Sequence, residues 1–442
     1  MLKKLLSFTL LLLTCGVVQA QDFSIDAQLK PRYEHRNGFN QLRPSNGDAD
    51  RAADFVSQRA RIRMLFNDKS NKFRFGFSAQ DVRTWGEIGN FANKDNGNFS
   101  IHEAWGELLF TEEFSVKAGR QEISYDDQRI FGAVDWAQQG RSHDAAVFKY
   151  EKAFKLHAGV AISATGETPY YNPGVNNYKA LQYLWFNKKF DQLSISALFL
   201  NNGVEQDVAG NQTSMPADFE TIYSQTLGAH GEWRPGKFGL NASFYYQMGA
   251  VGAGKTDLNA YNALVEVLFQ ASEGLSLNIG GEILSGTDAT ATDGVNRTFN
   301  PLYGTNHKFN GHMDYFYVGG ASRLPQGGLT DIYLGATYKM NEWKFYGKVH
   351  SFQSSAVIVD GTGAEVGNNL GTELDLNANY KFNDYISIQG GWSAMFATES
   401  MQYSTGANAG GDYEKFNNWG WMGIVIKPTL FTTKKKEAKT QG

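Results

Sequence analysis

Polar and apolar residues alternate along most of this chain, in stretches of about ten residues, a pattern typical of membrane β-strands. The stretch 25–36 has one wholly polar face, and its opposite face is apolar until the last residue. The stretch 54–67 repeats the pattern and carries three arginines on its polar face, Arg59, Arg61 and Arg63. A strand with lipid on one side and water on the other requires this alternation, so the pattern predicts membrane-spanning strands.

The same pattern predicts eighteen strands, an even number like that of single-chain bacterial outer-membrane barrels. The first nine lie near residues 25–36, 54–67, 72–83, 100–110, 113–121, 144–151, 154–164, 178–188 and 192–201. The others lie near residues 224–234, 237–249, 257–271, 274–285, 329–340, 342–353, 371–382, 384–397 and 415–428. These lengths suit a tilted strand, which needs about 9–11 residues to cross the hydrocarbon. Closing the sheet into a barrel satisfies the backbone hydrogen bonds, so that no edge meets lipid.

The connections between the predicted strands are sorted by length. Every even strand is followed by a tight link such as Pro235-Gly236 or Asn383-Asp384, whose residue types favour hairpin turns. Most odd strands are followed by long links, at 37–53, 84–99, 122–143, 165–177, 202–223, 286–328, 354–370 and 398–414, and only 250–256 is modest. Short turns on one rim and long loops on the other are typical of an outer-membrane barrel with both termini in the periplasm. The predicted fold class is all-β, a transmembrane antiparallel β-barrel of about 18 strands.

The composition agrees with such a barrel. Hydrophobic residues make up 42% of the chain and its mean hydropathy is -0.40, too polar for a bundle of membrane helices and too apolar for a disordered chain. Aromatic residues gather near the ends of the predicted strands, where we expect girdles at the lipid–water boundaries. The aromatic candidates are Phe73, Tyr125, Tyr245, Tyr246, Tyr315, Phe316, Tyr317, Trp343, Trp392, Trp419 and Trp421.

Residues 1–20 have the pattern of a signal peptide, with two lysines before an apolar core and a small-residue cleavage site after Ala20. Cleavage removes Cys15, the only cysteine, so the mature chain is expected to have no disulfide and no thiol nucleophile. The rest is interpreted as one barrel over 21–431 and a basic, flexible tail over 432–442.

Charge is unevenly placed along the mature chain, which retains 39 basic and 45 acidic residues for a net charge of -6. A nucleic-acid-binding protein would be basic, so that function is excluded. Basic residues nevertheless gather on the predicted lumen face of the early strands: Lys30, Arg32, Arg36, Arg59, Arg61, Arg63, Arg74 and Arg120. Arginines two residues apart lie about 6.6–7 Å from each other on a strand face and bind carboxylates bidentately. Predicted interior carboxylates are expected to pair with some of them: Asp26, Glu34, Glu103, Glu107, Glu266, Glu282, Glu373 and Asp375.

Catalytic and metal sites are not predicted. Glu103 and Glu107 share a strand face about 13 Å apart, farther than the ~5–9.5 Å between the carboxylates of a glycosidase. His307, His312 and Asp314 match no firm metal-ligand spacing. We therefore expect no cofactor, no metal and no enzyme activity.

The block 119–145, GRQEISYDDQRIFGAVDWAQQGRSHDA, resembles the alginate export family of outer-membrane channels. The segments that carry the resemblance are Gly119-Arg120-Gln121-Glu122, Asp127-Gln128-Arg129, Asp135-Trp136, Gly140-Arg141 and Asp144. Arg32-Tyr33-Glu34, the stretch 58–61 and the segments 300–316 and 331–339 are also similar to the family.

The resemblance implies a monomeric, 18-stranded barrel whose basic lumen is narrowed by inward loops and passes a polyuronate, such as alginate, by diffusion. It adds three arginines to the predicted pore lining, so that the set is Arg32, Arg59, Arg61, Arg63, Arg74, Arg120, Arg129 and Arg141. It also implies that four carboxylates orient these arginines: Glu34, Asp127, Asp135 and Asp144.

The leading functional hypothesis is an outer-membrane channel of a Gram-negative bacterium for an anionic polysaccharide or oligosaccharide. The channel is expected to be surrounded by outer-membrane lipid, and a periplasmic secretion protein is a candidate partner. The alternative is a general or anion-selective porin for small solutes, because the same arginines would favour small anions. A barrel enzyme would need a Ser-His pair near one rim, and none is well placed. An adhesive barrel that binds a partner through its long loops remains a further alternative.

Overall fold

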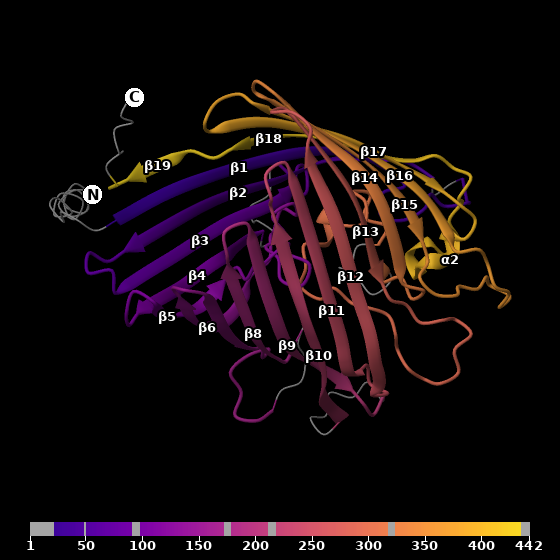
Figure 1. Ribbon diagram of the computed structural model, residues 1–442, viewed down its shortest axis with the longest axis horizontal. Coiled ribbons are helices and arrows are strands. Elements are labelled where there is room, and N and C mark those ends of the chain that lie inside the picture. The colour runs from indigo at the N-terminus through magenta and orange to yellow at the C-terminus, as the bar shows by residue number, and fades with distance from the viewer. Residues whose placement is uncertain are drawn as a thin grey trace.

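The strands of the computed structural model form one closed antiparallel sheet (Figure 1). The structure describes residues 22–47, 50–90, 98–171, 178–210, 218–316 and 323–434. Each strand pairs with its neighbours in sequence, and the first strand pairs with both the second and the last, which closes the barrel. The predicted signal peptide lies outside the described residues.

The strands of the first half are β1 (Asp22–Asn37), β2 (Ala53–Asn67), β3 (Phe73–Thr84), β4 (Phe99–Leu109), β5 (Phe114–Gln121), β6 (His143–Glu151), β7 (Lys155–Ile162), β8 (Ala180–Lys189) and β9 (Leu193–Asp207). Those of the second half are β10 (Phe219–Trp233), β11 (Phe238–Val251), β12 (Thr256–Gln270), β13 (Leu275–Leu284), β14 (Leu329–Met340), β15 (Trp343–Gln353), β16 (Asn369–Lys381), β17 (Ile386–Ala397), β18 (Asn417–Ile426) and β19 (Thr429–Thr432). Within the described residues, three short helices lie in the loops: η2 (Asn306–Lys308), α2 (Met401–Ser404) and η4 (Gly406–Asn408). The described residues contain no helix long and apolar enough to cross a membrane.

The predicted 18-strand barrel is confirmed, because each predicted strand coincides with one strand of the sheet and β18 and β19 together form the last one. Strands β18 and β19 are separated by Lys427 and Pro428, and proline lacks the backbone N–H that a continuous ladder would need. The Pro428 carbonyl still accepts a hydrogen bond from the Ala27 N–H at 3.0 Å. The last strand therefore remains paired with β1 across the interruption.

The predicted tail begins too early by a few residues. Thr432 belongs to β19, and the Thr433 N–H donates to the Phe23 carbonyl at 3.0 Å. Residues 435–442 lie outside the described part of the chain.

The largest differences in strand length occur at β9 and β10. Strand β9 extends six residues past the predicted end at 201, and β10 begins five residues before the predicted start at 224. Their outer ends pair with each other, from Phe219 opposite Asp207, whereas β8 and β11 stop short of them. This hairpin arm extends past the neighbouring strands. It begins at Asn201-Asn202-Gly203, residue types that favour a turn and therefore predict a loop.

Apolar side chains cover the outer face of the barrel, as the alternation requires. Phe73, Trp343 and Trp392 are exposed there, in agreement with the predicted girdles. Other predicted girdle residues are instead buried, namely Tyr245, Tyr315, Phe316 and Trp419, and Tyr125 is half-buried. They lie on the inward phase of a strand or on loops, and they pack with the segments that fill the lumen. Tyr317 lies outside the described residues.

Candidate functional site

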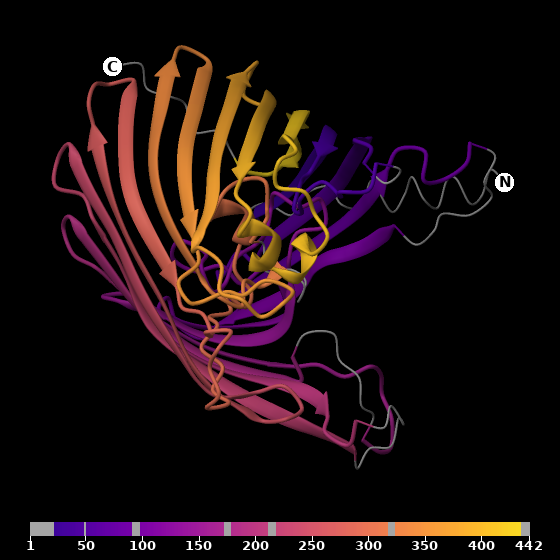
Figure 2. The same ribbon diagram turned by 90° about the vertical axis from the view of Figure 1, so that its right-hand side faces the viewer.

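Two long loops enter the barrel and join each other inside it (Figure 2). The first, 122–142, connects β5 and β6, and the second, 285–328, connects β13 and β14 and contains η2. Phe131 forms an isolated bridge with Tyr303, and the Gly132 N–H donates to the Tyr303 carbonyl at 2.9 Å. The Arg141 guanidinium donates to the Gly304 carbonyl at 2.9 Å. The predicted pore residue Arg141 therefore fastens one inward loop to the other.

Buried acidic side chains on the wall hold the second inward loop. The Met313 N–H donates to Glu373 at 2.8 Å, and the Asn310 amide donates to Glu282 at 2.9 Å. Gly311 has a left-handed backbone conformation with a φ of +85°, and a Cβ on it would lie 2.6 Å from a Glu373 oxygen. Glycine at this position lets the loop approach the wall closely enough for these hydrogen bonds.

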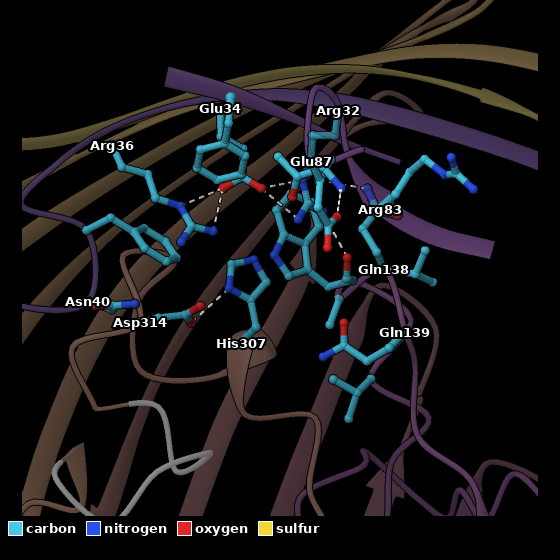
Figure 3. A pocket seen from close by; sticks show the side chains of 18 of the residues that line it. Arg32, Glu34, Arg36, Asn40, Arg83, Glu87, Gln138, Gln139, His307 and Asp314 are labelled. Carbon is cyan, nitrogen blue, oxygen red and sulfur yellow. Dashed lines mark hydrogen bonds and ion pairs between the residues drawn. The ribbon is translucent and has the colours of Figure 1, made fainter. Parts of the chain in front are cut away.

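A cavity of about 450 Å³ lies between the first strands and the inward loops, toward the rim that bears the long loops (Figure 3). We call it the loop-side cavity. Its charged lining residues are Arg32, Glu34, Arg36, Arg83, Glu87, Asp314 and Arg323. Basic and acidic side chains alternate around it, and several of them are paired with each other.

A second cavity, of about 720 Å³, lies toward the rim with the tight turns, and we call it the turn-side cavity. Three lysines line it, Lys308 from η2 and Lys344 and Lys348 from β15, together with Glu266 and Asp135. Its remaining walls are mainly aromatic side chains and amides: Trp136, Tyr346, Trp421, Asn278, Asn377, Asn379, Gln128 and Gln389.

The three lysines give the turn-side cavity a positive lining. Within the described residues none of the three has a carboxylate within ion-pair distance, whereas Asp135 is paired with Arg59 at 2.6 Å. Burial lowers the pKa of the neighbouring His312 to about 4, so this ring is neutral at pH 7. The three lysine ammonium groups therefore outnumber the remaining carboxylate of the lining, Glu266, which accepts hydrogen bonds from the Asn241 and Asn278 amides.

The predicted arginines of β1 and β2 lie on the lumen side but are largely neutralised there. Arg32 and Arg36 both pair with the buried Glu34 at 2.8 Å. The Glu34 carboxylate also accepts the Trp419 indole N–H at 3.1 Å. Glu34 thus holds the Arg32 guanidinium in place, and the three side chains together carry one net positive charge.

Arg59 and Arg61 are likewise committed to the protein. Arg59 is fully buried and binds Asp135 and the Gln138 carbonyl, the latter at 3.1 Å. Burial raises the pKa of Asp135, but the charges of Lys30 and Arg59 outweigh it, so the pKa lies below its ordinary value. Arg61 donates two hydrogen bonds to the Gln80 oxygen, at 2.9 and 2.6 Å.

Arg63 and Arg74 are the more open members of the predicted set. Arg63 lies 3.4 Å from Glu103, with 46% of its side chain exposed. Arg74 lies 3.7 Å from Glu107, with 38% exposed. Both remain accessible to a solute in the lumen.

Arg129 and Asp127 belong to the first inward loop. Arg129 is almost fully buried and binds Glu282 on β13, with its Nε 2.6 Å from a carboxylate oxygen. Asp127 accepts the Arg129 N–H at 3.0 Å, and its carbonyl accepts the Lys308 ammonium at 2.8 Å. Asp127 thus contacts the Arg129 backbone and not its guanidinium. Arg129 anchors the loop to the wall and does not line either cavity.

The predicted pore positions of Arg120 and Asp144 are wrong. Both lie on the outer face of the barrel, because Arg120 is paired in register with Ala104 and Asp144, whereas the lumen phase of β5 carries Lys117. The two side chains form an ion pair of 3.0 Å and are largely exposed. Near a strand end, a one-residue change of phase moves a side chain from the lumen to the outside.

The lysines of the turn-side cavity were missed by the sequence analysis. Lys344, Tyr346 and Lys348 occupy the polar phase of a predicted strand, so the period-two criterion applied to the early arginines would have found two of them. Lys308 lies in a long loop, where no periodicity indicates a direction. Among the described residues, no group of three or more His, Cys, Asp or Glu side chains is arranged to hold a metal ion.

The pairing predicts that Arg59 and Arg63 differ strongly in their effect on stability. We expect Arg59→Gln to lower the free energy of unfolding by about 2–3 kcal/mol, because it leaves buried partners of a charged group unsatisfied. We expect Arg63→Gln to change it by less than about 1 kcal/mol, as for an exposed ion pair. Urea unfolding in lipid vesicles, followed by tryptophan fluorescence, measures both. Equal losses in the two variants would contradict this assignment.

No protein-family model matches the chain, and no curated protein matches it in sequence. Solved structures do match: OpdL of Pseudomonas aeruginosa has a TM-score of 0.60 at 13% identity, covering 92% of this chain and 99% of its own. OccD3 (OpdP) of the same organism has a TM-score of 0.57 at 15% identity, with 94% and 93% covered. OccK1 (OpdK) has a TM-score of 0.59 at 9% identity, with 92% and 99% covered. The fold is that of an outer-membrane porin.

At these identities the likeness establishes the porin fold and nothing finer. The alginate export family indicated by the block 119–145 is not supported, because the similar structures are porins of another group. The block itself forms the first inward loop and the strand ends that flank it. Trp136 of this loop lines the turn-side cavity, whereas the ion pair of Arg120 and Asp144 lies outside the lumen.

Proposed function

We propose that this protein is a passive channel of the outer membrane of a Gram-negative bacterium, selective for small anionic solutes. The observation that carries the proposal is the lining of the turn-side cavity. Among the described residues, no carboxylate lies within ion-pair distance of Lys308, Lys344 or Lys348. Ammonium groups that are not neutralised by the wall raise the local concentration of anions in a narrow, weakly polarisable lumen.

The size of the cavities favours small solutes over a polymer. Volumes of about 450 and 720 Å³ are those of small-molecule sites. The inward loops are joined to each other and to the wall, so a polyuronate chain would have to displace hydrogen-bonded segments along its length. The alternative of the sequence analysis, an anion-selective porin, therefore replaces the polysaccharide channel as the leading hypothesis.

The lining of the turn-side cavity also indicates the chemical class of the anions. Flat aromatic faces and primary amides beside the lysines suit a carboxylate attached to a ring or to a hydroxylated frame. One of the similar structures, OpdK of Pseudomonas aeruginosa, was solved with vanillate, a small aromatic carboxylate. Both observations support small carboxylates as the first solutes to test.

Ion selectivity in planar bilayers tests the proposal. In a potassium chloride gradient, we expect a reversal potential that indicates preference for chloride. The Lys344→Gln/Lys348→Gln variant should shift this potential toward cation preference, because it removes two of the unpaired charges. Lys72→Gln, at the exposed turn between β2 and β3, removes the same kind of charge outside the lumen and should leave the potential unchanged. A wild-type channel that prefers cations would contradict the proposal.

A further inference from the structure

Among the described residues, Trp136 and His307 are the two that line both the loop-side and the turn-side cavity. Trp136 comes from the first inward loop and His307 from η2 in the second. Their rings are stacked, with centroids 4.5 Å apart and an interplanar angle of 14°. The stacked pair therefore stands between the two cavities, at the meeting point of the two loops.

The Trp136 indole is enclosed on both faces. The guanidinium carbon of Arg32 lies 4.0 Å from the ring centroid, and the His307 ring stacks at 4.5 Å. Two planar groups at these distances cannot share one ring face, so the indole lies between them. Trp419 and Trp421 meet it edge to face, at 5.6 and 4.7 Å. Four neighbours thus fix the plane of the indole within the lumen.

Basic residues of β1 and β2 fix the backbone on which the indole is carried. The Trp136 carbonyl accepts a hydrogen bond from Arg32 at 2.8 Å, and the Asp135 carbonyl accepts one from Lys30 at 2.8 Å. Arg59 binds the Asp135 carboxylate, as described above. Lys30, Arg32 and Arg59, which the sequence places on the lumen face, therefore hold this loop in place.

The opposite side of the stack is held by the second loop. The Nδ1 atom of His307 lies 2.8 Å from an Asp314 carboxylate oxygen, and both residues line the loop-side cavity (Figure 3). Asp314 in turn belongs to the segment that Glu373 anchors to the wall through Met313. The His307 ring therefore provides a fixed surface against which the indole rests.

We propose that the Trp136 indole is a partition that sets the size limit of this channel. A solute that leaves one cavity for the other passes the edge of the indole, and the free width there limits the largest solute admitted. The inference rests on the proposed function, since it assigns a size-determining residue to the same pathway. It does not depend on the charge of the solute, which allows the two proposals to be tested separately.

Liposome swelling with uncharged sugars of increasing size tests the partition. Trp136→Ala should admit sugars that the wild type excludes, and its single-channel conductance should rise about twofold or more, because the narrowest part of a pore dominates its resistance. Trp136→Phe retains an aromatic ring at the same position and should remain close to the wild type in both measurements.

Tyr346→Ala is the matched control, because Tyr346 lines only the turn-side cavity. This variant enlarges that cavity by a similar aromatic side chain and should leave the size limit unchanged. The proposal is overturned if Trp136→Ala keeps the wild-type size limit, or if Tyr346→Ala raises the limit equally. If Trp136→Ala does not show the heat-modifiable gel migration of a folded barrel, Trp136→Leu provides the same comparison with a smaller cavity.

Failure of the partition and failure of the proposed function give different results. If the channel prefers chloride but Trp136→Ala keeps the wild-type size limit, the proposed role of Trp136 is overturned and the proposed selectivity is not. A channel without anion preference whose size limit rises in Trp136→Ala overturns the proposed selectivity and supports the partition.

Discussion

Replacing Arg129 by methionine is expected to lower the free energy of unfolding by about 3–5 kcal/mol. Arg129 and Glu282 form a pair in which the two side chains are 1% and 2% exposed. Removing the arginine leaves the Glu282 charge buried, and the hydrogen bonds that then remain among the described residues come from the Asn262 and Asn310 amides. The loss also removes the guanidinium that lies over the Phe309 ring, at 4.0 Å.

Urea unfolding of the barrel in lipid vesicles, followed by tryptophan fluorescence, measures the loss. The Arg129→Met/Glu282→Met double variant is the control, because it removes both charges and replaces them with apolar side chains of similar length. Replacing a buried ion pair in this way is often neutral or stabilising, so we expect the double variant to recover most of the loss. A double variant as unstable as Arg129→Met would show that the uncompensated charge is not the cause.

The wall of the barrel was predictable because lipid imposes a simple rule on every strand. Each strand must alternate, must be long enough to cross the bilayer and must pair on both sides. The rule fails only where lipid is absent. The arm of β9 and β10 beyond residue 203 pairs outside the ring of neighbouring strands, and its sequence carries no alternation that marks it as a strand.

The inside of the barrel was less predictable, because side chains there meet loops rather than a uniform solvent. Trp419 lies on a strand, but it packs against the inward loops and not at a lipid boundary. Neither the direction of a long loop nor its contacts with a distant strand can be inferred from local periodicity. The contact of Arg129 with Glu282 joins residues 153 positions apart.

The charge of the pathway was misjudged for the same reason. A run of arginines on one strand face indicates a basic lumen only if no acids reach it, and here Glu34 and Asp135 do. Glu34 lies on the same strand face as Arg32, whereas Asp135 arrives on an inward loop. Lys344 and Lys348 form no comparable run in the sequence, yet no carboxylate of the described residues lies within ion-pair distance of either. Free charge, and not the number of basic residues, is what a solute meets.

Replacing Glu34 by alanine is expected to change both stability and selectivity. The Glu34 carboxylate is 1% exposed, pairs with Arg32 and Arg36, and accepts the Trp419 indole N–H. Its removal leaves the buried Arg32 guanidinium without a counter-charge, and we expect a loss of about 3–5 kcal/mol in the free energy of unfolding. The loop-side cavity also becomes more positive by one charge, so the preference for chloride in bilayers should increase.

Glu87→Gln separates the two effects, because Glu87 lines the same cavity but is exposed and has no arginine or lysine within ion-pair distance among the described residues. It changes the charge of the cavity by the same amount and should increase chloride preference at little cost in stability. Glu34→Gln keeps the shape of the side chain and an acceptor for Trp419, so its loss should lie between those of the other two variants. If Glu34→Ala lost no stability, Arg32 would have to be stabilised by its remaining contacts with Trp136 alone. Arg32 and Arg36 would then be available to bind solutes, as the arginine pattern of the sequence first indicated.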